Sequence, residues 1–205
     1  MTKPSRQSQA DKVSWDDYWQ SKSFKRRLIE FARRNYFSRI FISNVTESLN
    51  AGSSILEVGC GSGTYLRMLG RRGYRCYGVD NSMEAIAIAR RNCKKVQLAD
   101  IFHLPFKNNS IDIIFNQGVM EHFSDEEFDR ILKEFSRVSK RVCIIVPSNL
   151  SIWRIYDPIK DDEHKTFYSK QRLRNLLKKR FKNVRVHYLA RAGFLSICGQ
   201  GRNNV

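Results

Sequence analysis

The sequence predicts an α/β fold in which helices cover both faces of a doubly wound, largely parallel sheet. From residue 53 onward, short apolar runs alternate with helical patterns, as they do in successive βαβ units. The first apolar run, residues 55–58, leads directly into Gly59, Gly61 and Gly63, and a helical pattern opens at Thr64. This order of strand, tight glycine turn and helix often serves nucleotide ligands.

The other elements follow from the same periodicities. Helices are predicted at residues 64–71, 82–91, 125–139 and from Ser169 to Lys179; Ser124 and Glu127 form a capping box for the third of them. Strands are predicted at residues 75–79, 96–98, 111–115, 142–146, 184–189 and 194–199. The last two strands are close enough in the sequence to form a hairpin.

Composition limits the kind of protein this is. Hydrophobic residues make up 41% of the 205 residues, and there is neither a long apolar stretch nor an apolar signal core at the amino terminus. We therefore expect one soluble, cytoplasmic domain. The five cysteines are odd in number and not paired in C-x-x-C motifs, which predicts reduced thiols and no metal site.

The net charge of +17 has two interpretations. Dense lysine and arginine attract polyanions, so RNA or an anionic membrane surface is a candidate partner. Many of the cations, however, fall at the ends of predicted helices, where they favour the helix dipole and meet water. We favour this second interpretation, because no aromatic and basic RNA-binding signature accompanies the charge.

The glycine turn itself limits the ligand. Its glycines are spaced by two, with Thr64 where a dinucleotide fingerprint has its third glycine. Glu57, two residues before Gly59, would repel a phosphate and attract a cationic amino-acid ligand. A ligand other than a phosphate is therefore favoured.

At these residues the sequence resembles the class I S-adenosylmethionine-dependent methyltransferases, in the methyltransferase type 11-like branch, through the stretch ILEVGCGSGTYLRML. The resemblance implies a Rossmann-like, seven-stranded sheet with an antiparallel last strand and three α/β/α layers. It also implies S-adenosyl-L-methionine as cofactor and S-adenosyl-L-homocysteine as product. It covers residues 53–147 well and the rest of the chain loosely.

Further residues stand at the spacing that this resemblance expects. Asp80 ends the second strand, where a carboxylate suits a ribose diol. The resemblance places adenine at Asp100 and Ile101, and the methionine part near Asn116 and Gln117. The predicted cofactor-binding residues are Glu57, Gly59, Cys60, Gly61, Gly63, Thr64, Asp80, Asn81, Asp100, Ile101, Asn116 and Gln117.

Two aromatic segments are assigned to the acceptor side. Trp15, Tyr18 and Trp19 precede an amphipathic helical stretch, Phe24 to about Val45. The long irregular segment after the fifth strand brings Trp153 and Tyr156 to the edge of the sheet where ligands bind. The alternative is that these aromatic side chains pack in the core.

A sulfonium methyl group is already activated, so its transfer mainly needs an aligned acceptor and a dry site. A hydroxyl acceptor would benefit from a general base, for which His122 and His164 are the candidates. A nucleophilic role for Cys60 is not expected. For His122, packing in the loop after the fourth strand is the alternative.

We expect a disordered tail at residues 1–12 and a single methyltransferase domain at 13–205. Its parts are a helical cap, a cofactor-binding core, a substrate-side loop and a closing helix with hairpin, at residues 13–50, 53–147, 148–168 and 169–205. The favoured function is methyl transfer to a small organic acceptor. RNA methylation and a catalytically silent, cofactor-binding regulatory or scaffold protein stay open as alternatives, and the oligomeric state is not predicted.

Overall fold

The computed structural model describes residues 15–20, 38–47, 49–150, 166–191 and 194–202. Its strands are β1 (Ser54–Val58), β2 (Arg75–Asp80), β3 (Val96–Leu98), β4 (Ile113–Gln117), β5 (Arg141–Pro147), β6 (Lys182–Arg191) and β7 (Phe194–Arg202). Its helices are α1 (Trp15–Gln20), α3 (Ser38–Thr46), α4 (Thr64–Gly70), α5 (Met83–Ala89), the 3₁₀ turn η3 (Met120–His122), α6 (Asp125–Val138) and α7 (Lys170–Lys178).

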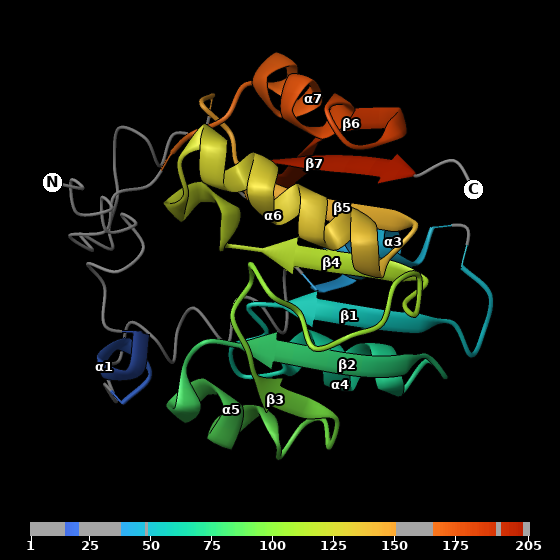
Figure 1. Cartoon of the computed structure of the whole chain (residues 1–205), viewed down its shortest axis with the longest axis vertical. Helices are drawn as coiled ribbons and strands as arrows, with labels where there is room; N and C mark the ends of the chain where they lie inside the picture. Colours follow the sequence, from blue (N-terminus) through green and yellow to red (C-terminus); the bar gives the residue numbers. More distant parts are fainter. Residues whose placement is uncertain (1–14, 21–37, 48, 151–165, 192–193, 203–205) are drawn as a thin grey trace, which may run out of the picture.

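Within the described residues, the strands form one seven-stranded sheet in the order β3-β2-β1-β4-β5-β7-β6. Strands β3, β2, β1, β4 and β5 are parallel, whereas β7 runs antiparallel to both β5 and β6 (Figure 1). The predicted fold class is confirmed, including the antiparallel last strand and the closing hairpin.

Helices cover both faces of this sheet, as the alternation of side chains along the strands requires. Leu56 and Ile114 point to a core shared with α6 and α7. Their strand neighbours Ile55, Ile113 and Phe115 point to a second core shared with α3, α4 and α5. Two apolar cores on opposite faces of one sheet make three α/β/α layers.

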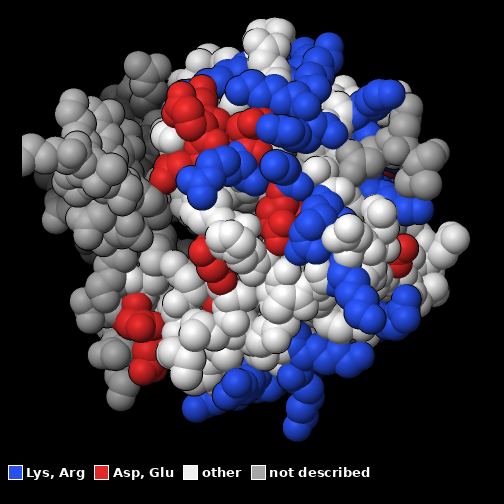
Figure 2. Space-filling view, in the orientation of Figure 1, with Lys and Arg blue, Asp and Glu red and all other residues white. Residues whose placement is uncertain are grey.

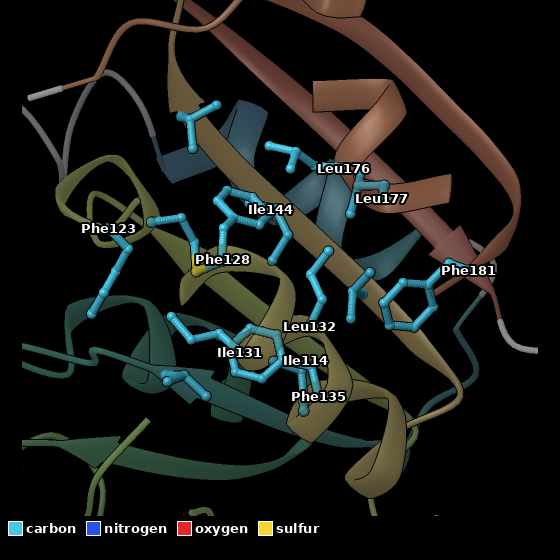
Figure 3. Packing of buried hydrophobic residues seen from close by; sticks show 14 of the residues in the cluster. Ile114, Phe123, Phe128, Ile131, Leu132, Phe135, Ile144, Leu176, Leu177 and Phe181 are labelled. Carbon is cyan, nitrogen blue, oxygen red and sulfur yellow. The ribbon is translucent and has the colours of Figure 1, made fainter. Parts of the chain in front are cut away.

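Helix α6 is favoured by a capped amino-terminal end and by a continuous apolar face. At its start, Ser124 Oγ accepts a hydrogen bond from Glu127 N while Glu127 Oε2 accepts one from Ser124 N, which is the predicted capping box. Its buried residues Phe128, Ile131, Leu132, Phe135 and Val138 recur every three or four positions. These side chains belong to one core cluster with residues of β4 and β5 and with Leu176, Leu177 and Phe181, and most of them are labelled in Figure 3.

Element boundaries differ from the predicted ones by a few residues. Strand β4 begins at Ile113 rather than 111, because the Asp112 carboxylate accepts hydrogen bonds from the backbone and hydroxyl of Ser54 at the start of β1. Of the predicted helix from Phe24 to Val45, α3 represents the second part, and residues 24–37 lie outside the described residues. The short helix α1 lies within the helical cap expected at residues 13–50, although no separate helix was predicted at its own residues.

Candidate cofactor site

The candidate site lies at the edge of the sheet where the parallel strands end. Strand β1 pairs with β2 on one side and with β4 on the other. The order of the strands along the chain therefore reverses beside β1. Ligands of open α/β sheets bind at such a switch point. In Figure 1 this is the left edge, toward which β1, β2 and β4 point and near which α1 lies.

Two glycines of the turn after β1 are enclosed by other elements. Gly59 has a φ of 71°, and a Cβ there would lie 2.3 Å from Val119 Cγ2 in the loop after β4. Gly61 has a φ of 50°, and a Cβ there would lie 2.7 Å from the indole of Trp19 in α1. Both the backbone conformation and the space therefore demand glycine.

Gly63 has another role, because a Cβ there would lie 3.2 Å from the Cβ of Ala89 in α5. It allows α4 and α5 to approach each other, whereas the first two glycines allow Val119 and Trp19 to lie against the backbone of the turn.

Asp80, the last residue of β2, holds this turn in place by accepting backbone hydrogen bonds. Its Oδ2 accepts a hydrogen bond from Gly61 N at 2.8 Å, and its Oδ1 accepts one from Ser82 N at 3.0 Å. Burial raises the pKa of this carboxyl, and the backbone hydrogen bonds partly offset that rise. Because each carboxylate oxygen can accept two hydrogen bonds, Asp80 keeps capacity for a ligand hydroxyl.

Asn116 and Glu57 lie on the neighbouring strands, and both are buried. Asn116 Nδ2 donates to the carbonyl of Val58 at 2.9 Å, just before the glycine turn. Its Oδ1 is buried without a hydrogen-bond partner among the described residues. A buried acceptor of this kind calls for a donor, and the amino group of an amino-acid ligand is one.

Cys60 lies within the turn and is buried. Burial, followed by the charges of Glu57 and Asp80, raises the pKa of its thiol. A thiol kept neutral in this way is a poor nucleophile, in agreement with the expectation from the sequence.

The predicted adenine side is more open. Asp100 lies two residues beyond β3, with its Oδ1 accepting a hydrogen bond from Phe102 N at 2.9 Å and 58% of its side chain exposed. Ile101 is partly buried against the core shared with α6, and Asn81 is exposed. At the end of β4, Gln117 Oε1 is buried without a hydrogen-bond partner in the described part of the chain.

Helix α1 brings the amino-terminal aromatic side chains to this edge. Trp19 is 8% exposed and lies against Gly61, and the Trp15 ring packs edge-on against His122 at 5.2 Å between ring centres. The side chain of Tyr18 lies outside the described residues, as do Trp153, Tyr156 and His164. The structure thus joins Trp15, a predicted substrate-side residue, to the predicted catalytic residue His122, and it joins Trp19 to the glycine turn.

Three residues at this edge were missed from the sequence. Val119 packs on Gly59, and Asp16 of α1 accepts a hydrogen bond from Ser82 at the start of α5. Ser82 could have been found from the sequence, because a serine just before a helix is a typical N-cap, and its Oγ does accept a hydrogen bond from Ala85 N. Asp16 and Val119 had none, because their partners are far away in the sequence.

Other site types find no support within the described residues. No group of three or more His, Cys, Asp or Glu side chains there is arranged to hold a metal ion. In the same part of the chain, every helix is too short or too polar to cross a membrane.

The comparisons with known proteins agree with this geometry. Residues 56–146 match the family model described as a methyltransferase domain. They include β1, the glycine turn, Asp80 and the strands through β5. This central part of the chain is therefore similar to a methyltransferase domain.

Individual relatives differ in what they are named for. Over 88 residues the chain is 35% identical to a probable tRNA methyltransferase 9B of Mus musculus, a match covering 42% of this chain and 19% of that protein. It is 30% identical over 166 residues to an uncharacterized protein of Methanocaldococcus jannaschii, covering 80% of this chain and 58% of that one. The chain thus spans a small part to little more than half of these relatives.

A similar solved structure is that of magnesium protoporphyrin IX methyltransferase from Synechocystis with bound S-adenosylmethionine. The TM-score is 0.72 at 14% identity, with 99% of this chain and 100% of that one covered. At this identity the likeness shows the fold alone.

Proposed function

We propose that this protein is an S-adenosylmethionine-dependent methyltransferase that acts on a small organic acceptor. The observation that carries the proposal is the glycine turn at the switch point, fastened by Asp80 and flanked by the buried, unsatisfied acceptor of Asn116. When bound, S-adenosylmethionine supplies an activated methyl group on a sulfonium. Donors on its amino group and ribose match the acceptors that surround this turn.

The polar side chains around the turn would each bind a different part of S-adenosylmethionine. Asp80 takes the ribose hydroxyls with the lone pairs that its two backbone bonds leave free. Glu57 and Asn116, both buried near the end of β1, attract and orient the amino group. Asp100 and Ile101 flank adenine, with the exposed carboxylate as acceptor for its amino group.

The chemistry asked of the protein is alignment and exclusion of water. An in-line displacement at an activated methyl group gains most from holding the two reactants in line. Trp19 on the glycine turn and Trp15 on His122 cover the edge where this happens. A small acceptor is favoured over RNA because no aromatic and basic RNA-binding signature accompanies the charge in the sequence.

The cofactor assignment is tested by isothermal titration with S-adenosylhomocysteine. We expect Asp80→Ala to weaken binding by tenfold or more and Asp100→Ala by less, since its carboxylate is more exposed. Glu126→Ala, which removes an exposed acid from the first turn of α6, is the matched control. If well-folded wild type does not bind, the proposal fails. Binding without transfer to any acceptor pool would favour the catalytically silent alternative.

We further propose His122 as the general base for a hydroxyl acceptor. It is 9% exposed and contacts Trp15 of the covering helix. His122→Phe keeps an aromatic ring against Trp15 but accepts no proton. With the acceptor in hand, we expect the rate of transfer to fall by about 10²–10⁴ while cofactor affinity is kept. A loss below tenfold would assign His122 to packing alone.

RNA is the second candidate acceptor, because of the exposed cations and because one relative is named a probable tRNA methyltransferase. Titration of RNA at about 50 mM and 200 mM salt separates the two proposals. For a small-molecule enzyme we expect weak RNA binding that disappears at the higher salt. Persistent binding and methyl transfer to RNA would favour the second candidate.

A further inference from the structure

The contacts of α1 are made with three different elements of the cofactor edge. Trp19 covers Gly61 of the turn after β1, Trp15 packs on His122 of η3, and Asp16 reaches the start of α5. Trp15 and Trp19 bring apolar surface, whereas Asp16 places its carboxylate at a polar turn. This carboxylate therefore decides how α1 is oriented on the site.

The partner of Asp16 is Ser82, whose hydroxyl both accepts and donates a hydrogen bond. Ser82 Oγ accepts a hydrogen bond from Ala85 N at 3.1 Å and donates its proton to Asp16 Oδ1 at 2.5 Å. Glu84 N also points at Asp16 Oδ1, at 3.4 Å. A carboxylate acceptor on a hydroxyl makes a strong hydrogen bond, so this contact anchors α1 when it lies against the start of α5.

The same contact brings Asp16 close to Asp80. Ser82 bridges the two carboxylates, because its N–H donates to Asp80 Oδ1 while its hydroxyl donates to Asp16. The Asp16 charge raises the pKa of Asp80, in addition to the larger effect of burial. Docking of α1 thus places a second negative charge beside a buried one, which opposes docking.

A ligand whose hydroxyls donate hydrogen bonds to Asp80 changes this balance. The ribose hydroxyls of the proposed cofactor would stabilise the Asp80 charge, weaken its repulsion with Asp16 and make the docked position of α1 more favourable. By linkage, whatever favours docking also tightens the ligand by the same factor.

We propose that Asp16 is a positioning residue: through Ser82 it holds Trp19 and Trp15 over the cofactor, and its charge makes this closure depend on the bound cofactor. This rests on the proposed cofactor, because the coupling needs ligand hydroxyls that donate to Asp80.

Two substitutions separate the hydrogen bond from the charge. Asp16→Ala removes both, so α1 loses its anchor with or without ligand. Asp16→Asn keeps an oxygen acceptor for the Ser82 hydroxyl and removes the repulsion with Asp80. Asp16→Asn should therefore dock α1 even without ligand.

Docking is measured by trypsin cleavage after Lys22, Lys25 and Arg26, which follow α1 in the sequence. In wild type we expect S-adenosylhomocysteine to slow cleavage there several-fold. Asp16→Ala should abolish this protection and weaken the ligand about tenfold, as expected for one charge-assisted hydrogen bond. Asp16→Asn should show slow cleavage already without ligand. Glu126→Ala is the control for loss of an exposed carboxylate.

The outcomes are distinguishable from those of the cofactor proposal. If S-adenosylhomocysteine binds wild type and Asp16→Ala equally, with equal protection, the role of Asp16 is refuted while the cofactor site stands. If Asp16→Asn behaves like Asp16→Ala, the charge coupling is refuted. If folded wild type does not bind the ligand, both proposals fall together.

Discussion

Gly61 shows how much a single residue contributes to this site. Its φ of 50° belongs to the left-handed region, and the Trp19 indole occupies the space that a side chain would need. Its N–H meanwhile donates to Asp80. One residue thus joins the backbone of the turn, the acid of β2 and the covering helix.

We predict that Gly61→Ala displaces α1 and weakens S-adenosylhomocysteine at least tenfold, since its Cβ would lie 2.7 Å from Trp19. The left-handed backbone alone costs about 1–2 kcal/mol with a side chain. Gly73→Ala isolates that cost, because Gly73 has a φ of 84° and nothing within 4 Å of the added Cβ. Equal ligand affinity of Gly61→Ala and Gly73→Ala in calorimetry would contradict the prediction.

At the scale of elements, α6 depends on the fit of its buried face. Phe135 is fully buried in the core cluster that also holds side chains of β4, β5 and α7 (Figure 3). Its ring fills space that neighbouring side chains cannot reach without moving.

We predict that Phe135→Ala lowers the free energy of unfolding by about 3–5 kcal/mol, from lost burial and from the cavity left behind. Urea denaturation measures this difference. Lys133→Ala changes an exposed position of the same helix and should stay within about 0.5 kcal/mol. A similar effect of the two substitutions would mean that the face is not packed as described.

Strands β1 and β4 are joined at their starts by Asp112, which accepts hydrogen bonds from Ser54 N and Ser54 Oγ at 2.7 and 2.8 Å. The Ser54 backbone N–H, more than any other group, lowers the pKa of Asp112. The folded state therefore binds this proton less readily than the unfolded chain. The stabilisation is present at pH above about 4, the unfolded pKa, and is lost as pH falls through the folded value.

We predict that Asp112→Asn destabilises the protein at pH 7 and destabilises it less at pH 3, because pH 3 lies below the unfolded pKa of about 4 and part of the wild-type stabilisation is lost there. Urea denaturation at both pH values gives the two differences. An equal difference at pH 3 and pH 7 would show that the ionised carboxylate contributes nothing.

At the scale of the whole molecule, the topology determines at which edge of the sheet the basic side chains lie. Each helix of a parallel unit ends where the next strand begins, so cations after α4, α5, α6 and α7 gather at the edge opposite to the cofactor site. The exposed ones are Arg71, Arg72, Arg90, Arg91, Lys94, Lys95, Lys140, Lys178, Lys179 and Arg180. In Figure 2 most acidic side chains lie toward the left, and basic ones spread over the upper, right and lower parts.

This arrangement predicts where residual RNA binding resides. Reversing Arg90, Arg91 and Lys94 to Glu should abolish binding at low salt and leave S-adenosylhomocysteine affinity unchanged, because these residues lie at the far edge. Filter binding and calorimetry measure the two effects. RNA binding that survives the reversal would place the interface elsewhere.

Much of the fold was readable from the sequence because its signals are local. The alternation of apolar runs, the capping box at Ser124 and the glycines at 59, 61 and 63 each depend on neighbours within a few residues. Strand ends were less predictable, as at β4, because Asp112 is bonded to Ser54, 58 residues away.

The sequence by itself determined the fold class and the residues around the glycine turn, since backbone conformation and burial periodicity restrict which side chains can stand there. Only the tertiary structure decided which distant residues complete the edge. Segments far apart in the chain make these contacts: Val119 with Gly59, Trp19 with Gly61, and Asp16 with Ser82. No local pattern encodes such contacts, because they arise from how the strands are ordered and where the covering helix docks.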